Sequence, residues 1–139
     1  MSTIKIKKLS ELLDSWQQDN NGMKKAFLAF YELLESKDIV HLSFKSRPGV
    51  SHSLRAGIRE KKGKERIITL MDIIDDEPEN RWLSICFYAE NITDPGEEGD
   101  IIPGGLLGED GYCFDLFEDD EDMISYLKDR INEACEKYL

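Results

Sequence analysis

The sequence has no apolar run long enough to cross a membrane. A transmembrane helix needs about 20 consecutive apolar residues, and no segment of the 139-residue chain approaches that length. The first eight residues, MSTIKIKK, lack the apolar centre and the small-residue cleavage site of a secretory signal. We therefore expect no membrane association and a cytoplasmic location.

Cysteine is also scarce. The three cysteines, Cys86, Cys113 and Cys135, are odd in number and far apart in the sequence, and two of them stand among apolar neighbours. This pattern is typical of reduced core residues in a reducing compartment rather than of a disulfide framework. No Cys/His spacing suits a zinc site.

Catalytic motifs are missing as well. The segment 49–53, GVSHS, matches only the first half of the G-x-S-x-G nucleophile elbow and leads into a strand rather than a helix. The only histidines are His41 and His52, and strand alternation puts them on opposite faces of the predicted sheet. The acidic runs do not match the spacing of a calcium loop. We therefore predict no catalytic residue, no metal site and no cofactor.

Basic residues are nearly absent from one long segment of the chain. The net charge is −11, which argues against non-specific binding to nucleic acid. Residues 41–66 carry eight Lys or Arg and two Glu, whereas residues 72–122 carry eighteen Asp or Glu and a single Arg. Since both ends of the chain are balanced, the net charge comes from a basic segment of +6 and an acidic segment of −17.

Length and composition indicate one domain, 1–139. Hydrophobic residues make up 40% of the chain, which is enough for a single core at this length. Apolar residues at helical spacing predict helices over 9–18, 23–36 and 121–138. The acidic residues before the last of these suit the positive end of its helix dipole.

Between the second and third helices the apolar period changes from 3.6 to 2. This pattern predicts five strands, and a short sixth strand near the N-terminus, at 39–45, 51–58, 66–74, 82–89, 112–117 and 3–7. Sequential strands with short connections favour an antiparallel meander. The predicted fold is therefore α+β, with a five-stranded antiparallel meander, or six strands with the N-terminal one, packed by an N-terminal helical pair and a C-terminal helix.

The basic segment contains a predicted hairpin, 41–59, whose turn is marked by Pro48-Gly49. A three-residue turn places Phe44 opposite Leu54, whereas a two-residue turn would place it opposite Ser53, so we prefer the three-residue turn. The other face then carries the residues that we predict to bind an anionic ligand: Lys45, Arg47, Ser51, Ser53 and Arg55. The planar fork of arginine suits a carboxylate or phosphate. The alternative is an ordinary solvated sheet face.

The segment 94–111 is predicted to be a long loop rich in glycine, proline and acidic residues. A strand rather than a helix follows it, which excludes a phosphate-binding loop. Loops of this length are often functional, so one interpretation is a lid or a partner-binding loop. The other is an ordinary connection in which Leu106 and Leu107 plug an open edge of the core.

The leading hypothesis is a non-enzymatic binding or adaptor domain that contacts an unknown protein partner through its charged surface and segment 94–111. Acidic segments attract basic partners and accelerate association. The alternative is a small-molecule binding protein or enzyme that holds an anionic ligand on the hairpin 41–59. A third hypothesis is self-association, in which the basic hairpin of one copy meets the acidic segment of another.

Overall fold

The computed structural model describes residues 4–60 and 63–139. Within this range the chain forms three α-helices, one short 3-10 helix and a six-stranded antiparallel sheet, so the predicted α+β class and the helical packing are confirmed. In the same range no helix combines the length and the apolar character of a membrane span. In chain order the elements are α1 (Lys7–Ser15), α2 (Met23–Glu35), β1 (His41–Arg47), β2 (Ser51–Arg59), β3 (Glu65–Ile74), β4 (Trp82–Tyr88), η1 (Ala89–Asn91), β5 (Asp100–Leu106), β6 (Glu109–Leu116) and α3 (Glu121–Glu136).

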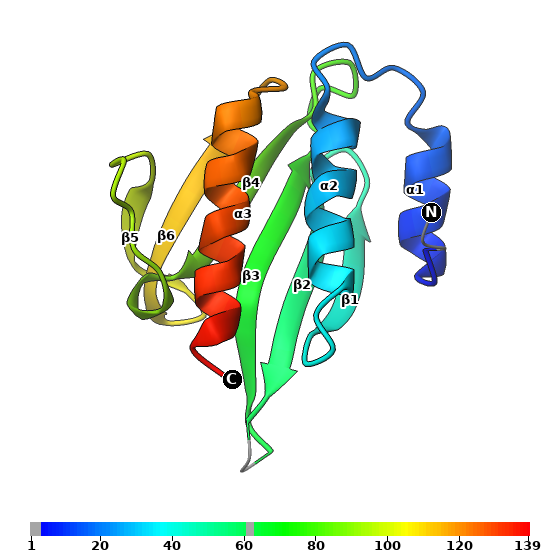
Figure 1. Ribbon diagram of the computed structural model, residues 1–139. Helices are drawn as coiled ribbons and strands as arrows, with labels where there is room; N and C mark the ends of the chain where they lie inside the picture. Colours follow the sequence, from blue (N-terminus) through cyan, green and yellow to red (C-terminus); the bar gives the residue numbers. More distant parts are fainter. Residues whose placement is uncertain (1–3, 61–62) are drawn as a thin grey trace.

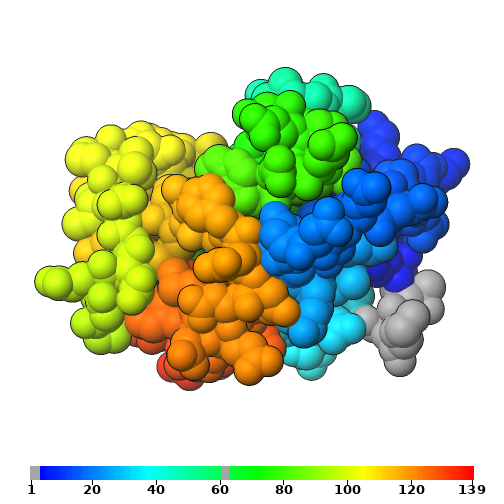
Figure 2. Space-filling view, turned by 90° about the horizontal axis from the view of Figure 1, so that it is seen from above, coloured from blue at the N-terminus to red at the C-terminus, as the bar shows by residue number. Residues whose placement is uncertain are grey.

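The helices cover one face of the sheet. Helices α2 and α3 lie side by side across that face, and α1 lies beyond the β1 edge (Figure 1). The strand order is β1-β2-β3-β4-β6-β5, so β1 and β5 are the two edge strands. Seen from above, the segment with α1 and the β5–β6 segment lie at opposite ends of the molecule (Figure 2). The opposite face of the sheet, which none of the described helices covers, is called the outer face below.

The core lies between the helices and the inner face of the sheet. Apolar residues at helical spacing form the buried stripes of α1 and α2, and alternate strand residues complete the layer. Burying one large apolar side chain stabilises the fold by roughly 1.5–3 kcal/mol. The fully buried side chains include Phe27, Phe30, Leu54, Met71, Ile73, Phe87 and Phe114.

The β1–β2 hairpin has the predicted register. Leu42 lies opposite Ala56 and Phe44 lies opposite Leu54, with residues 48–50 as the turn. Gly49 has a φ of 79° in this turn, a left-handed conformation that glycine adopts without steric cost. The matching of apolar faces therefore identified the register correctly.

The prediction of a loop throughout 94–111 is wrong in its second half. Strands β5 and β6 form a hairpin there, and β6 rather than β5 lies beside β4, so the sheet is not a simple meander. Pro103, Gly104 and Gly105 concealed the strand because these residues are rare in strand interiors. The register shift between Ile102 and Leu106 accommodates them.

The sixth strand is thus β5 and not the strand predicted at 3–7. Residues 4–6 form no strand, and Lys7 already begins α1, which ends at Ser15 rather than at residue 18 as predicted. Thr3 lies outside the described residues.

The two leucines of the β5–β6 hairpin have different environments. Leu106 is buried as predicted, but in a small cluster with Ile67 and Tyr88 that is separate from the main core rather than at the edge of that core. Leu107 is 60% exposed in the turn, so the same prediction is wrong for this residue.

Two of the three cysteines are paired, which contradicts the interpretation that all are reduced. Cys86 on β4 and Cys113 on β6 are direct cross-strand partners and form a disulfide with a Cα–Cα distance of 4.1 Å. Their separation of 27 residues concealed the pairing, because it arises only from the strand order. Cys135 is buried and free, as predicted.

We expect the unreduced protein to show one thiol, that of Cys135, when it is unfolded in denaturant and titrated with Ellman's reagent. Full reduction should raise the count to three and lower the free energy of unfolding by about 3 kcal/mol, since the disulfide restricts the unfolded chain. In a Cys135→Ser control the count before reduction should be zero. Three reactive thiols before reduction would contradict the disulfide.

Candidate binding face

The outer face carries the side chains that alternate with the core positions of each strand. Core residues such as Leu54, Met71 and Ile85 point toward the helices, so their immediate neighbours in the strands point away from them. The cross-strand registers align these neighbours in three rows. The rows are Arg47-Ser51-Ile74-Trp82, Lys45-Ser53-Asp72-Ser84-Asp115, and Ser43-Arg55-Leu70-Cys86-Cys113-Asp100.

The structure brings the five predicted anion-binding residues together at the β1–β2 side of the outer face. Lys45, Arg47 and Arg55 are exposed, Ser53 is half-buried, and Ser51 is buried and accepts a hydrogen bond of 3.2 Å from Arg47 Nη2. The two pockets described below, around Arg66 and His52, do not include any of the five. The five residues form an open basic patch, and their role as a ligand site stays a prediction.

Carboxylates occupy the other side of the outer face. Asp72 lies on β3, Asp115 on β6 and Asp100 on β5. Partial burial, and then repulsion from Asp100, raise the pKa of Asp115 above its usual range. The Oδ1 atom of Asp72 is buried and has no hydrogen-bond partner among the described residues. This side of the face is therefore acidic and incompletely neutralised.

An apolar strip lies across the upper row of the outer face. Ile74 on β3 lies opposite Trp82 on β4, and the Trp82 ring lies 4.9 Å from the ring of Phe117, which follows β6. Phe117 is 57% exposed. Aromatic residues of this kind, flanked by charged groups, are enriched in protein interfaces.

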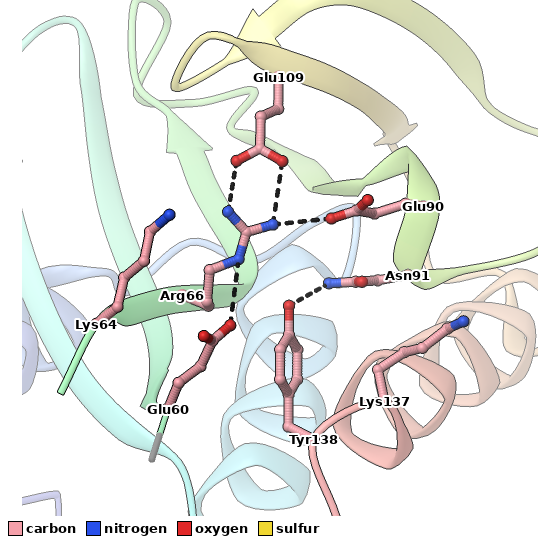
Figure 3. A pocket seen from close by; sticks show the side chains of 8 residues that line it. All are labelled: Glu60, Lys64, Arg66, Glu90, Asn91, Glu109, Lys137 and Tyr138. Carbon is pink, nitrogen blue, oxygen red and sulfur yellow. Dashed lines mark hydrogen bonds and ion pairs between the residues drawn. The ribbon is translucent and has the colours of Figure 1, made fainter. Parts of the chain in front are cut away.

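A polar pocket of about 570 Å³ surrounds Arg66 (Figure 3). The guanidinium donates two hydrogen bonds to Glu109, of 2.5 and 3.0 Å, and one of 2.9 Å to Glu90. It also lies 4.1 Å from the ring centroid of Tyr88. The hydrogen bond from Arg66 holds the pKa of the Glu109 carboxyl below its usual range. Because two carboxylates occupy its donors, Arg66 joins β3 to η1 and to the β5–β6 hairpin and is not free to bind an anion.

The Arg66 cluster shows how part of the charge asymmetry is used inside the molecule. Arg66 belongs to the basic segment, and Glu90 and Glu109 belong to the acidic segment. By contrast, none of the ion pairs among the described residues includes Lys45, Arg47 or Arg55. Their charges are therefore available at the surface.

A second polar cluster connects the hairpin turn to the start of β4. His52 Nε2 donates to Asp75 Oδ2 at 2.7 Å, His52 Nδ1 is hydrogen-bonded to the Ser46 hydroxyl, and Arg81 Nε donates to Asp75 Oδ1 at 2.7 Å. The cluster lines a groove of about 470 Å³ beneath α1, and the Arg81 guanidinium lies 5.1 Å from the ring of Trp16.

We assign the His52 cluster a structural role. A hydroxyl, an imidazole and a carboxylate in a row is also the order of a hydrolase triad. Here, however, only 4% of the His52 side chain and 7% of the Asp75 side chain are exposed, and Arg81 neutralises the carboxylate. The prediction that His52 and His41 lie on opposite faces is correct, but the contact of His52 with Asp75 was not predicted. Its pairing with His52 depends on the β2–β3 register, in which Ser51 lies opposite Ile74.

Comparison of the chain with protein-family models, with curated proteins and with solved structures finds no match.

We expect Asp75→Asn to lower the free energy of unfolding at neutral pH by about 3 kcal/mol, because it breaks a buried ion pair. Burial would raise the pKa of Asp75, but the hydrogen bonds and charges of Arg81 and His52 lower it overall. A lowered pKa stabilises the fold above the pKa of the unfolded state, about 3.9, and this contribution is lost as the pH falls through the folded pKa.

Denaturant unfolding between neutral and acid pH measures this contribution. Asp75→Asn should lose less stability than the wild type over the acid range, and Asp76→Asn, which changes an exposed neighbour, should resemble the wild type. An acid dependence of Asp75→Asn identical to that of the wild type would show that the cluster does not act as described.

Proposed function

We propose that the protein is a non-enzymatic binding or adaptor domain and that a protein partner docks on its outer face. The observation that carries this proposal is the combination of three cations that pair with no described carboxylate, Lys45, Arg47 and Arg55, with the exposed aromatic residue Phe117 on a sheet face that no described helix covers. Interface energy is commonly concentrated in aromatic and arginine side chains, with polar residues around them.

The segment 94–111 contributes to this proposal as an edge of the sheet rather than as a mobile lid. Strand β5 is an edge strand, and its Ile101 and Ile102 side chains are 54% and 42% exposed. Edge strands offer unpaired backbone groups to a partner, so a partner on the outer face can extend its contact onto β5.

The alternative function, binding of an anionic small molecule, uses the same cations together with Ser51 and Ser53. It differs in one respect that can be measured. A small anion held by Lys45, Arg47 and Arg55 does not need the aromatic strip, whereas a protein partner does. Phosphorylated and carboxylated metabolites, titrated in NMR experiments, should shift these residues equally in the wild type and in Phe117→Ser if the alternative is correct.

For a protein partner, we expect the double variant Arg47→Glu/Arg55→Glu to lose the proteins that the immobilised wild type retains from a lysate at low salt. Phe117→Ser should weaken the same retention, because it removes an exposed aromatic contact. Retention by the wild type should fall at high salt, which screens exposed charges.

The matched control is Lys7→Glu/Lys128→Glu, which makes the same change of net charge on α1 and α3. It should retain what the wild type retains. If all variants retain the same proteins, or if the wild type retains none at low salt and does not associate with a second copy of itself, the proposal that the outer face binds a partner is wrong.

A separate prediction concerns Asp115. Its raised pKa means that its ionised form destabilises the folded chain, so stability falls as the pH rises from the unfolded pKa through the folded pKa. Asp115→Asn should therefore raise the thermal midpoint at neutral pH. It should also lower partner retention, because it removes a charge from the acidic side of the outer face. Asp129→Asn, an equal charge change on α3, should lower neither. A fall in both midpoint and retention for Asp115→Asn would indicate a structural role instead.

A further inference from the structure

Charges of opposite sign are separated across the outer face. The exposed cations Lys45, Arg47 and Arg55 lie on β1 and β2, and the carboxylates Asp72, Asp115 and Asp100 lie on β3, β6 and β5. The strand order places β1 and β5 at the two edges of the sheet (Figure 1). The face therefore has a positive side on β1 and β2 and a negative side on β6 and β5, with Asp72 between them on β3.

This pattern is self-complementary for one symmetric arrangement. The centre of the order β1-β2-β3-β4-β6-β5 lies between β3 and β4. A two-fold axis in the interface, parallel to the strands and passing through that centre, places β1 of one copy over β5 of the other, β2 over β6, and β3 over β4. Each positive side then faces a negative side.

The other simple two-fold arrangement is disfavoured by the same charges. An axis in the interface but perpendicular to the strands would place β1 over β1 and β2 over β2, so Lys45, Arg47 and Arg55 would meet their own copies. Juxtaposed like charges strongly oppose association. The charge pattern thus selects the axis that is parallel to the strands.

We propose that a second copy of this chain docks on the outer face, sheet against sheet, about a two-fold axis parallel to the strands. This inference rests on the proposed function of the outer face and names the partner. The apolar strip of Ile74, Trp82 and Phe117 is covered in this arrangement. Ser84 of one copy lies over Asp72 of the other, because the two residues are cross-strand partners on β4 and β3, on either side of the axis.

The first test is the oligomeric state of the purified full chain, measured by sedimentation equilibrium over a range of concentrations. We expect a reversible monomer–dimer equilibrium whose dissociation constant rises with salt, since the flanking ion pairs are partly exposed. A chain that remains monomeric at every concentration and salt would overturn the inference. If outer-face variants then still lost other retained proteins, the proposed function would stand without it.

Charge reversal gives a sharper test. Lys45→Glu/Arg55→Glu makes both sides of the face negative, and Asp100→Lys/Asp115→Lys makes both sides positive. Each variant alone should dimerise at least about tenfold more weakly than the wild type, because like charges then meet across the interface. An equimolar mixture should form a heterodimer with an affinity close to that of the wild type, since each positive side again meets a negative side.

The mixture also separates this arrangement from a general loss of folding, because an unfolded variant cannot restore association. The control pair Lys7→Glu/Lys128→Glu should dimerise like the wild type. Dimers that are unaffected by both outer-face variants would place the contact on another surface and overturn the inference, and so would two variants that remain monomeric when mixed.

The axis itself can be tested by cross-linking in a Cys135→Ser background that keeps the Cys86–Cys113 disulfide. With strands ~5 Å apart and packed sheets ~10 Å apart, the parallel axis brings the two Ser84 Cα atoms to about 11 Å and holds the two Ser43 Cα atoms about 26 Å apart. A short thiol-reactive linker should therefore join copies of Ser84→Cys and not copies of Ser43→Cys. The reverse result would contradict the proposed axis.

Discussion

The register of the β1–β2 hairpin determines which side chains reach the outer face. Leu42 and Phe44 lie opposite Ala56 and Leu54 and pack toward the core, which leaves Lys45 and Arg47 on the outer side. A slip of one residue would exchange these two sets. Burying lysine and arginine without partners costs far more than burying Phe44 gains, so only the observed register is stable, and the basic side of the outer face follows from it.

Sequence periodicity predicted the elements whose residues repeat at the period of a helix or a strand. Helices α2 and α3 and strands β1 to β4 were found close to their observed bounds for this reason. Strand β5 was missed because Pro103 and its neighbouring glycines break the apolar alternation, and only pairing with β6 makes this segment extended. The Cys86–Cys113 disulfide and the contact between His52 and Asp75 were missed because strand order and register bring these residues together, and neither can be read from local spacing.

The candidate site was likewise predictable from the sequence in one part and not in the other. Its basic side consists of residues from one hairpin, so alternation within a short segment was enough to place Lys45, Arg47, Ser51, Ser53 and Arg55 on one face. Its acidic side joins Asp72, Asp115 and Asp100 from three strands, and their proximity depends on the position of β6 between β4 and β5. From the sequence, only the total charge of the acidic segment could be predicted. The folded sheet places Asp115 and Asp100 at the side away from the basic residues, with Asp72 between the two sides.

The chain carries a large excess of carboxylates, so internal neutralisation of every cation would have been possible in terms of charge alone. Arg66 and Arg81 are neutralised in this way, each by carboxylates of the acidic segment. Lys45, Arg47 and Arg55 pair with no carboxylate in the described part of the chain, and they lie at the side of the sheet farthest from Asp100 and Asp115. Keeping like charges together raises the energy of the isolated chain. The pKa of Asp115 is raised first by burial and then by repulsion from Asp100, so part of its shift reflects this cost. A complementary surface that covers the face would offset this cost. The charge asymmetry of the sequence is therefore explained by binding rather than by folding.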